Sequence, residues 1–489
     1  MTDQECHDIY AQGEAAVVAA LQSLASALIA AHGEMSVAVA ALTQRVQELE
    51  ARLSKDSHNS GKPPSSDGLR KKPAPKSLRP MTGKPSGGQP GHPGVTLCLS
   101  DSPDETLSHA PTVCSECHAS LEGVPTQDCA RRQVHDLPPL KLHVTEHRAF
   151  SAVCPRCQTL NRAPFPAPVS QPVQYGARLK ALCVYLQQYQ LLPYARTSEL
   201  LSDLLGASLC QATLANTLSA CHESLAQTEA AIKTAVGSAP VAHFDETGIR
   251  IDGKLHWLHT ASTKTLTFLA AHEKRGREAA DLIGILPTFS GTAVHDAFAT
   301  YFGYGCSHAL CNAHLLRELI FLQEQTGQPW IPELISLLLD GKRHVEQARS
   351  RGETRLPVAC RDALVARYHA LIGEGRAANP PTPPSGKRGR TKQTDAYNLL
   401  ERLGRHPQAV LAFLHGFAVP FDNNQAERDL RMSKVRQKIS GCFRSREGAD
   451  IFCRVRGYIA TLRKQGIHVL TALQSVFEGS PIMPKCTAE

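Results

Sequence analysis

Residues 240–296 read PVAHFDETGIRIDGKLHWLHTASTKTLTFLAAHEKRGREAADLIGILPTFSGTAVHD, and this stretch decides the fold. Its first apolar run ends in the acidic and turn residues DETG, and an Asp252-Gly253 turn signal precedes the next run. Short apolar runs that alternate with polar residues predict strands, whereas REAADLIGIL has the character of a helix. The predicted order is strand, hairpin strand, strand, helix and strand, at residues 240–245, 255–261, 266–270, 277–286 and 291–296.

This order of elements is that of a ribonuclease-H-like core with a mixed α/β sheet. It places Asp245 and Asp296 at strand ends, where parallel neighbours bring them together. A third carboxylate lies far downstream in PFDNNQAERDLR, where Asp422 or Asn423 is a credible N-cap for a helix that carries Glu427. Oxygen ligands at few positions suit Mg²⁺, and two such ions would activate a water or a 3′-hydroxyl for in-line displacement at a phosphodiester.

Other acidic residues compete for these positions, because the chain has 45 of them. Glu246 is the first rival to Asp245. Alternation along a strand sends these neighbours to opposite faces, so only one of them should reach the ions. Asp281 and Asp422 are rivals for the other two positions, whereas Asp252 is better explained as a turn residue.

Two C-x-x-C pairs predict a zinc-binding module. Two such knuckles complete a closed, tetrahedral site of four thiolates, which is typical of structural zinc. The predicted ligands are Cys114, Cys117, Cys154 and Cys157. Cys129 and His118 are rival ligands, and the alternative is that the thiols are free and buried.

The composition and the first residues of the chain indicate the cellular compartment in which the protein works. The 489 residues exceed one ordinary domain, and the net charge is a mildly basic +8. The chain has 16 cysteines, but its polar, acidic start has no secretory signal, so we expect a reducing cytoplasm and metal rather than disulfides. The Ala-rich stretch Ala15–Ala31 is interrupted by Gln22, Ser23 and Ser26, which makes it a poor membrane span and predicts no membrane partner.

Composition shifts along the chain predict a multi-domain α+β protein. Heptad spacing in the first segment predicts a coiled coil and a homo-oligomer, with an amphipathic helix packed on its own domain as the alternative. The expected parts are an N-terminal helix (1–53), a basic flexible linker (54–100), a zinc-finger-like domain (101–170), a helical DNA-binding or connector region (171–238), the first part of the core (239–307), a helical insertion with a basic loop (308–414), the second part of the core with the Glu427 helix (415–478) and a tail (479–489).

Several motifs together resemble the insertion-sequence-66 family of bacterial transposases. They are FDETG with Asp245, VHDAFATY with Asp296, and FDNNQAERDLRMSKVRQKISGCFRS with Glu427. The arm KDSHNSGKPPSSDG followed by GGQPGHPG, and the knuckles CSECHASL and CPRC, are also similar to that family. The resemblance extends from the N-terminal helix to about Phe477, and the motifs agree in order.

The resemblance implies a DDE-type transposase with a helical insertion between its second and third carboxylates. In that family pattern, Asp245, Asp296 and Glu427 hold two Mg²⁺ or Mn²⁺ ions for cleavage at the ends of the element and 3′-hydroxyl attack on target DNA. A Cys-x-x-His element, Cys311 with His314, supports the active site or strand handling, or else simply packs inward. Helper proteins encoded beside the transposase are also implied.

Two basic groups are candidates for contacts with the DNA backbone. One is a loop and the other a helix face after Glu427, where arginine forks suit phosphate oxygens. The residues are Lys387, Arg388, Arg390 and Lys392 in the loop, and Arg428, Arg431 and Lys434 in the helix. A solvated basic surface is the alternative for both.

The sequence therefore predicts a cytoplasmic, nucleoid-associated DNA transposase that binds element ends and target DNA. One alternative is a ribonuclease-H-like nuclease or junction resolvase, which would use the same metal ions but would not catalyse strand transfer. A second alternative is a non-catalytic zinc DNA-binding regulator, which would have the same fold without the catalytic activity.

Overall fold

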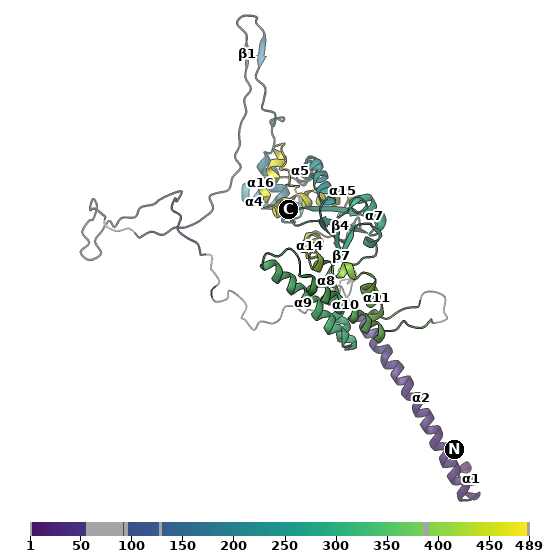
Figure 1. Cartoon of the computed structure of the whole chain (residues 1–489). Helices are drawn as coiled ribbons and strands as arrows, with labels where there is room; N and C mark the ends of the chain where they lie inside the picture. Colours follow the sequence, from purple (N-terminus) through teal and green to yellow (C-terminus); the bar gives the residue numbers. More distant parts are fainter. Residues whose placement is uncertain (1, 55–90, 92–95, 127–129, 385–390, 487–489) are drawn as a thin grey trace. The chain divides into compact units, whose positions relative to one another are not determined.

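The computed structural model in Figure 1 describes most of the chain, in residues 2–54, 91, 96–126, 130–384 and 391–486. The chain divides into two compact units. The first comprises Met1–Lys71, Phe165–Thr197 and Cys210–Glu489, and the second comprises Lys72–Pro164 and Ser198–Leu209.

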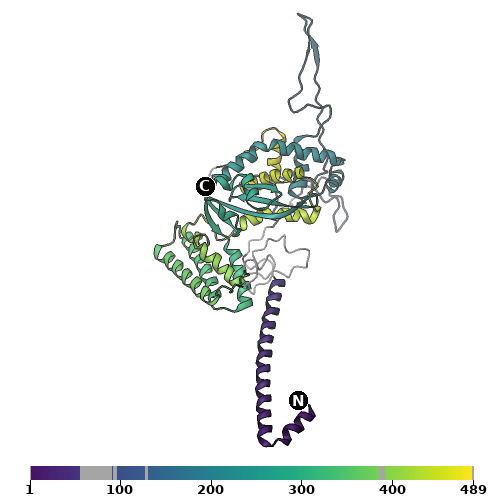
Figure 2. The same ribbon diagram turned by 90° about the vertical axis from the view of Figure 1, so that its right-hand side faces the viewer.

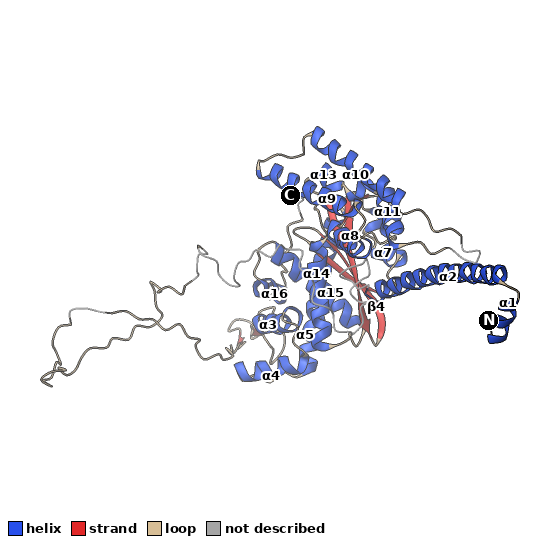
Figure 3. Cartoon of the chain, turned by 90° about the horizontal axis from the view of Figure 1, so that it is seen from below, coloured by secondary structure: helices blue, strands red, loops and turns tan. Residues whose placement is uncertain are grey.

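A mixed five-stranded sheet lies at the centre of the first unit (Figure 3). Its order is β5-β4-β3-β6-β7, with strand bounds β3 Val241–Ile251, β4 Lys254–Ser262, β5 Thr267–His272, β6 Thr292–His295 and β7 Ser307–Leu310. Strands β3, β4 and β5 pair antiparallel, and β6 and β7 add parallel strands on the other side of β3. The mixed α and β architecture agrees with the sequence analysis.

The β3–β4 hairpin is tight because Asp252 and Gly253 both have positive φ, 49° and 71°. A two-residue turn of this kind matches the twist of the strands that it joins. Asp252 is therefore a turn residue, as predicted. The structure extends β3 beyond the predicted strand as far as Ile251, because Ile249 and Ile251 continue the apolar face of the strand.

Helices cover both faces of the sheet (Figure 2). On one face Phe244 packs with Ile232 of α6 (Ala226–Gly237) and Ala280 of α7 (Arg277–Ile283). On the other face Ile249 packs with residues of α14 and α15. Those two helices span Asn424–Ser440 and Arg446–Lys464, and the short 3₁₀ turns η3 (Leu286–Thr288) and η4 (Tyr301–Gly303) flank β6.

A group of helices between β7 and α14 has its own apolar core. Trp330, Leu334, Tyr368 and Leu400 are buried within it. Its elements are α8 (Asn312–Thr326), α9 (Trp330–Ser350), α10 (Val358–Ala378), α11 (Asp395–Arg405), α12 (Pro407–Val410) and α13 (Ala412–His415).

A third cluster joins the helices before the sheet to the end of the chain. Val184, Leu218, Ile459 and Leu473 are buried together in it. The helices are α3 (Ala177–Val184), the π-helical η2 (Tyr185–Tyr189), α5 (Gln211–Ser224) and α16 (Val469–Phe477). Helix α4 (Tyr194–Leu205) contributes no residue to this cluster. Because α15 contributes Ile459, this cluster continues the packing of the sheet-covering helix.

The N-terminal segment is helical, as α1 (Asp3–Ala11) and the 41-residue α2 (Glu14–Ser54). Large apolar side chains of α2, such as Leu28 and Leu42, are exposed in this chain. The part Glu14–Thr43 is long and apolar enough to cross a membrane by length and composition alone, a test that other apolar helices also pass. Despite the polar residues Ser23 and Ser26, this stretch therefore meets the length and composition of a membrane-spanning helix.

Candidate active site

Asp245 is a half-buried carboxylate in the middle of β3. Its Oδ1 accepts the backbone N–H of Glu246 at 2.8 Å. Burial raises the pKa of Asp245 well above its usual value, and the nearby carboxylates of Glu246, Asp296 and Glu427 raise it further. The three carboxylates predicted from sequence therefore act on one another electrostatically, although they are far apart in the chain.

Asp296 follows β6 directly, and β6 is the parallel neighbour of β3. Its Oδ1 accepts the N–H of Phe298 at 3.1 Å. Ala297, between them, has a positive φ of 71°, so the chain turns sharply immediately after the carboxylate. The parallel pairing brings the end of β6 beside Asp245, as the sequence analysis expects of strand ends.

Glu427 lies in the first turn of α14, and the start of this helix is tied to β3. The buried side chain of Asn423 donates from Nδ2 to the carbonyl of Phe244 at 2.9 Å, and its Oδ1 lies 2.8 Å from Nδ1 of His243. Asn423 is the N-cap residue, but its side chain makes no capping bond, because both ends of its amide are used by β3. Asp422 instead accepts the N–H of Asn424, at 3.1 Å.

Glu246 points to the opposite face of the sheet, and its carboxylate is already occupied. Oε1 lies 2.7 Å from the guanidinium of Arg275, and Oε2 accepts the hydroxyl of Tyr301. Burial, followed by repulsion from Asp296, raises the pKa of Glu246 to about 7, while Arg275 opposes the rise. Glu246 thus has the partners of a structural carboxylate, and Asp245 on the other face does not.

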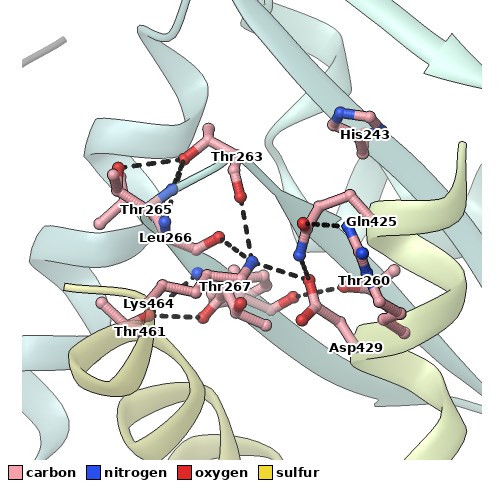
Figure 4. A network of polar contacts seen from close by, with 12 residues as sticks. His243, Thr260, Thr263, Thr265, Leu266, Thr267, Gln425, Asp429, Thr461 and Lys464 are labelled. Atoms are coloured by element: carbon pink, nitrogen blue, oxygen red, sulfur yellow. Dashed lines mark hydrogen bonds and ion pairs between the residues drawn. The ribbon is translucent and has the colours of Figure 1, made fainter. Parts of the chain in front are cut away.

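A buried ion pair fixes α14 from its other side (Figure 4). Lys464 of α15 donates to Asp429 at 2.9 Å and to the carbonyls of Thr263 and Leu266, each at 3.0 Å. Gln425 donates to the same carboxylate at 3.2 Å. The network joins the Glu427 helix to α15 and to the β4–β5 connection. Sequence reasoning missed it, because nothing in the local pattern pairs residues 35 positions apart.

Cys311 and His314 lie next to Glu427. Cys311 ends the β7 segment as the N-cap of α8, and its buried Sγ accepts the N–H of Asn423 at 3.1 Å. The Nε2 of His314 is 3.7 Å from Oε1 of Glu427. One donor atom from each of the three residues lies within 4.8 Å of the others.

The predicted DNA-binding residues differ in solvent exposure and in whether their charged groups are already hydrogen-bonded. Arg428 and Arg431 are exposed on α14, and Lys392 is exposed in its loop. Lys434 is half-buried and donates to the carbonyl of Gly248 at 2.7 Å, so its ammonium is engaged with β3. The other predicted loop residues, Lys387, Arg388 and Arg390, lie outside the described residues.

In the second unit, the two C-x-x-C pairs form matching turns. In each, the first cysteine donates its N–H to the residue five positions on, and His118 and Gln158 occupy equivalent positions with φ of 59° and 60°. The second pair lies in the loop between β1 (Ser151–Val153) and β2 (Leu160–Arg162). Among the described residues, no three of the four sulfur atoms come within 4.8 Å of one another, so the predicted four-thiolate cluster is not assembled here. The rival Cys129 lies outside those residues.

The predicted rivals for the other carboxylate positions also have their own partners. Asp281 accepts the hydroxyl of Tyr304 at 2.7 Å and pairs with Arg277. Asp422 caps the start of α14. Neither carboxylate appears among the causes that shift the pKa of Asp245.

Two family comparisons match the chain. A family of unknown function (DUF6444) matches residues 13–97, and no curated protein matches. The family described as "Transposase IS66 family" matches residues 172–451, which are more than half of the chain and contain Asp245, Asp296 and Glu427. The two C-x-x-C pairs fall between the matched ranges. By the extent of this match, the chain belongs to the IS66 family of transposases.

Proposed function

We propose that this transposase is of the DDE type: it cuts DNA at the ends of its element in a metal-dependent reaction and transfers the 3′ end to target DNA. The observation that carries the proposal is the convergence of Asp245, Asp296 and Glu427: β6, which Asp296 follows, is the parallel neighbour of β3, and Asn423 ties the first turn of α14 to Phe244. They come from β3, the end of β6 and α14, and Glu246 is withdrawn to the opposite face by Arg275.

The sheet supports a ribonuclease-H-like core. Three antiparallel strands are followed by α7 and two parallel strands, in the order β5-β4-β3-β6-β7. The sequence analysis predicted three strands, a helix and a fourth strand, and the structure adds β7 as a fifth strand. Asp245 lies on the central strand and Asp296 ends its parallel neighbour, which gives the two carboxylates a rigid support.

The carboxylate group fits divalent cations of the Mg²⁺ class. The mutual repulsion that raises the pKa of Asp245 marks an excess of negative charge, and Oε1 of Glu427 is buried without a hydrogen-bond partner. Asp245, Asp296 and Glu427 would hold such ions, which supply activation of the attacking hydroxyl and stabilisation of the leaving oxygen.

Other residues of the chain would position Glu427 and bind the DNA. Asn423 and the Lys464–Asp429 pair hold α14 so that Glu427 keeps its place beside β3. Arg428 and Arg431 are exposed on the same helix, where their guanidinium groups can bind phosphate oxygens of the DNA. The exposed Lys392 extends the basic surface in the loop.

As part of this proposal, a structural zinc ion would draw together Cys114, Cys117, Cys154 and Cys157, whose sulfur atoms are not clustered in the described structure. The matching turns support it, because each arranges a pair of thiols in the same way. The pKa of Cys114 is lowered, first by the backbone N–H of Cys117, which favours the thiolate that binds zinc. Zinc lost from the Cys114→Ser variant would support the assignment, and unchanged zinc content would refute it.

The decisive experiment is cleavage of DNA that carries the element's ends, with purified full-length protein and Mg²⁺. Glu427→Gln should lower the cleavage rate by about 100-fold or more, since it removes one of the three negatively charged ligands of the metal ions. Glu447→Gln is the matched control, because Glu447 is exposed in the first turn of α15. Equal cleavage by the wild type and Glu427→Gln would reject the proposal. Cleavage without joined products would indicate a nuclease instead.

A further inference from the structure

The cluster of Cys311, His314 and Glu427 has the composition of a metal site for a softer ion than Mg²⁺. Cys311 and His314 stand at the start of α8, and their spacing puts both on one helical turn. Glu427 reaches the same place from the first turn of α14. The donor atoms lie within 4.8 Å of one another, so small side-chain movements would bring them to a common ion.

Two polar atoms of this cluster lack hydrogen-bond partners. Nδ1 of His314 and Oε1 of Glu427 are buried without a hydrogen bond. Buried polar atoms are normally hydrogen-bonded, so two unpaired atoms in one cluster require an explanation. The 3.7 Å between Nε2 of His314 and Oε1 of Glu427 is too long for a hydrogen bond. A direct His–Glu interaction therefore does not account for both atoms.

The sulfur of Cys311 is held in a fixed position, although burial raises the pKa of its thiol to about 12, so only a bound cation would favour the thiolate. Its sulfur is buried and accepts the N–H of Asn423 at 3.1 Å, and that same residue is anchored to β3 by its side chain. Backbone donors of this kind orient a ligating sulfur and tune its charge. The sulfur is thus held in place by the element that also positions Glu427.

We propose that Cys311, His314 and Glu427 bind a zinc ion beside the three-carboxylate site, with a fourth position open to water. Sulfur and imidazole donors select zinc over Mg²⁺, and three protein ligands with one open position form a recognised zinc geometry. On binding, the Cys311 thiol loses its proton to solvent as the sulfur–zinc bond forms. Glu427 would then have one oxygen on zinc and the other available to the Mg²⁺-class ions of the proposed function, so the zinc ion would fix the orientation of this carboxylate.

The test measures zinc per chain in the full-length protein, and the absorption spectrum after Co²⁺ replaces zinc. Cys311→Ser and His314→Gln should each lose one zinc ion per chain relative to the wild type, and Cys311→Ser should also lose part of the sulfur-to-cobalt absorption. Cys360→Ser is the matched control, because Cys360 is a half-buried thiol in α10, outside the cluster. The comparison is made against the wild type, so zinc held by Cys114 and its partners cancels.

Folding is checked by far-ultraviolet circular dichroism. If Cys311→Ser does not fold, the half-buried His314→Gln still decides the matter. Wild-type zinc content and an unchanged cobalt spectrum in a folded His314→Gln variant would overturn the zinc site. No DNA is present, so the result is independent of catalysis. Asp245→Asn should abolish cleavage while keeping this zinc ion, which separates failure of this site from failure of the proposed activity.

Discussion

Asn423 shows how one side chain can set the geometry of a site that it does not join. Both ends of its amide bind β3, at His243 and at the carbonyl of Phe244, directly before Asp245. Its backbone N–H binds the sulfur of Cys311. The helix that carries Glu427 therefore starts at a fixed point on the strand that carries Asp245.

Replacing Asn423 by alanine should destabilise the protein and disturb the site. The carbonyl of Phe244 would lose its buried partner, at about 1–3 kcal/mol per unsatisfied group. Chemical denaturation should show this loss, and DNA cleavage should fall with it. Asn398→Ala is the control, because Asn398 is exposed in α11. Equal losses in the two variants would contradict this role for Asn423.

The buried histidines should make stability depend on pH. Burial lowers the pKa of His259 to about 4 and that of His295 to about 3, against about 6.5 in an unfolded chain. Protonation therefore favours the unfolded state. The contribution of these histidines to the free energy of unfolding should be highest above pH 6.5 and be lost as the pH drops from 6.5 towards 4. The raised pKa values of Asp245 and Glu246 act in the opposite direction, so the histidine contribution is measured as a difference between variants.

His259→Gln should reduce this slope without removing it, because His295 titrates in the same direction. The glutamine amide can still donate to the carbonyl of Lys274, which now lies 3.2 Å from Nε2 of His259. Denaturant unfolding at several pH values measures the slope. An identical slope in wild type and variant would show that His259 does not contribute.

At the scale of elements, α14 is held on two sides while its first turn presents Glu427. Asn423 fixes its start to β3, and Asp429, two residues after Glu427, pairs with Lys464 of α15. The side chains of Lys464 and Asp429 are only 13% and 8% exposed. A buried pair like this is costly to break from one side, since the remaining charge stays in a poorly solvated place.

Asp429→Asn should therefore destabilise the protein by about 3–5 kcal/mol, because the Lys464 ammonium keeps its charge without a partner. Lys464→Met in the same chain should recover part of that loss. A double-mutant cycle in chemical denaturation measures the coupling. Strictly additive losses from the two substitutions would mean that the pair has no interaction energy.

Local patterns predicted four strands of the sheet and placed Asp296 at a strand end, because alternation and turn residues are visible within a few positions. Asp245 was expected at a strand end too, but β3 continues past it to Ile251. The fifth strand, Ser307–Leu310, was missed, since it is short and leads directly into a helix. The contact of Asn423 with His243 spans 180 residues, and no pattern along the chain encodes it. The same holds for the meeting of Cys311 with Glu427, which were assigned to separate roles from sequence.

At the scale of the whole molecule, α2 presents apolar side chains that are exposed among the described residues. Leu21, Leu28 and Leu42 are 62%, 72% and 66% exposed. Their heptad-like spacing fits a second copy of the helix better than solvent. The transposase should therefore associate through α2.

Leu28→Glu combined with Leu42→Glu should lower the mass of the assembly in light scattering after gel filtration, since charges in the seam of a coiled coil prevent packing. Tyr10→Glu, which changes an exposed residue of α1 outside the heptads, should keep the wild-type mass. A wild-type chain that is already monomeric would contradict the expectation.

The order of the elements also matters while the protein is being made. The ribosome completes β3 and β6 early, but α14 follows only after the whole group of helices from α8 to α13, and its anchor Lys464 is later still. At about 5–20 residues per second, several seconds of translation separate the second acidic residue from the third. A nascent or prematurely released polypeptide therefore lacks Glu427, and under the proposed mechanism it should not cleave DNA.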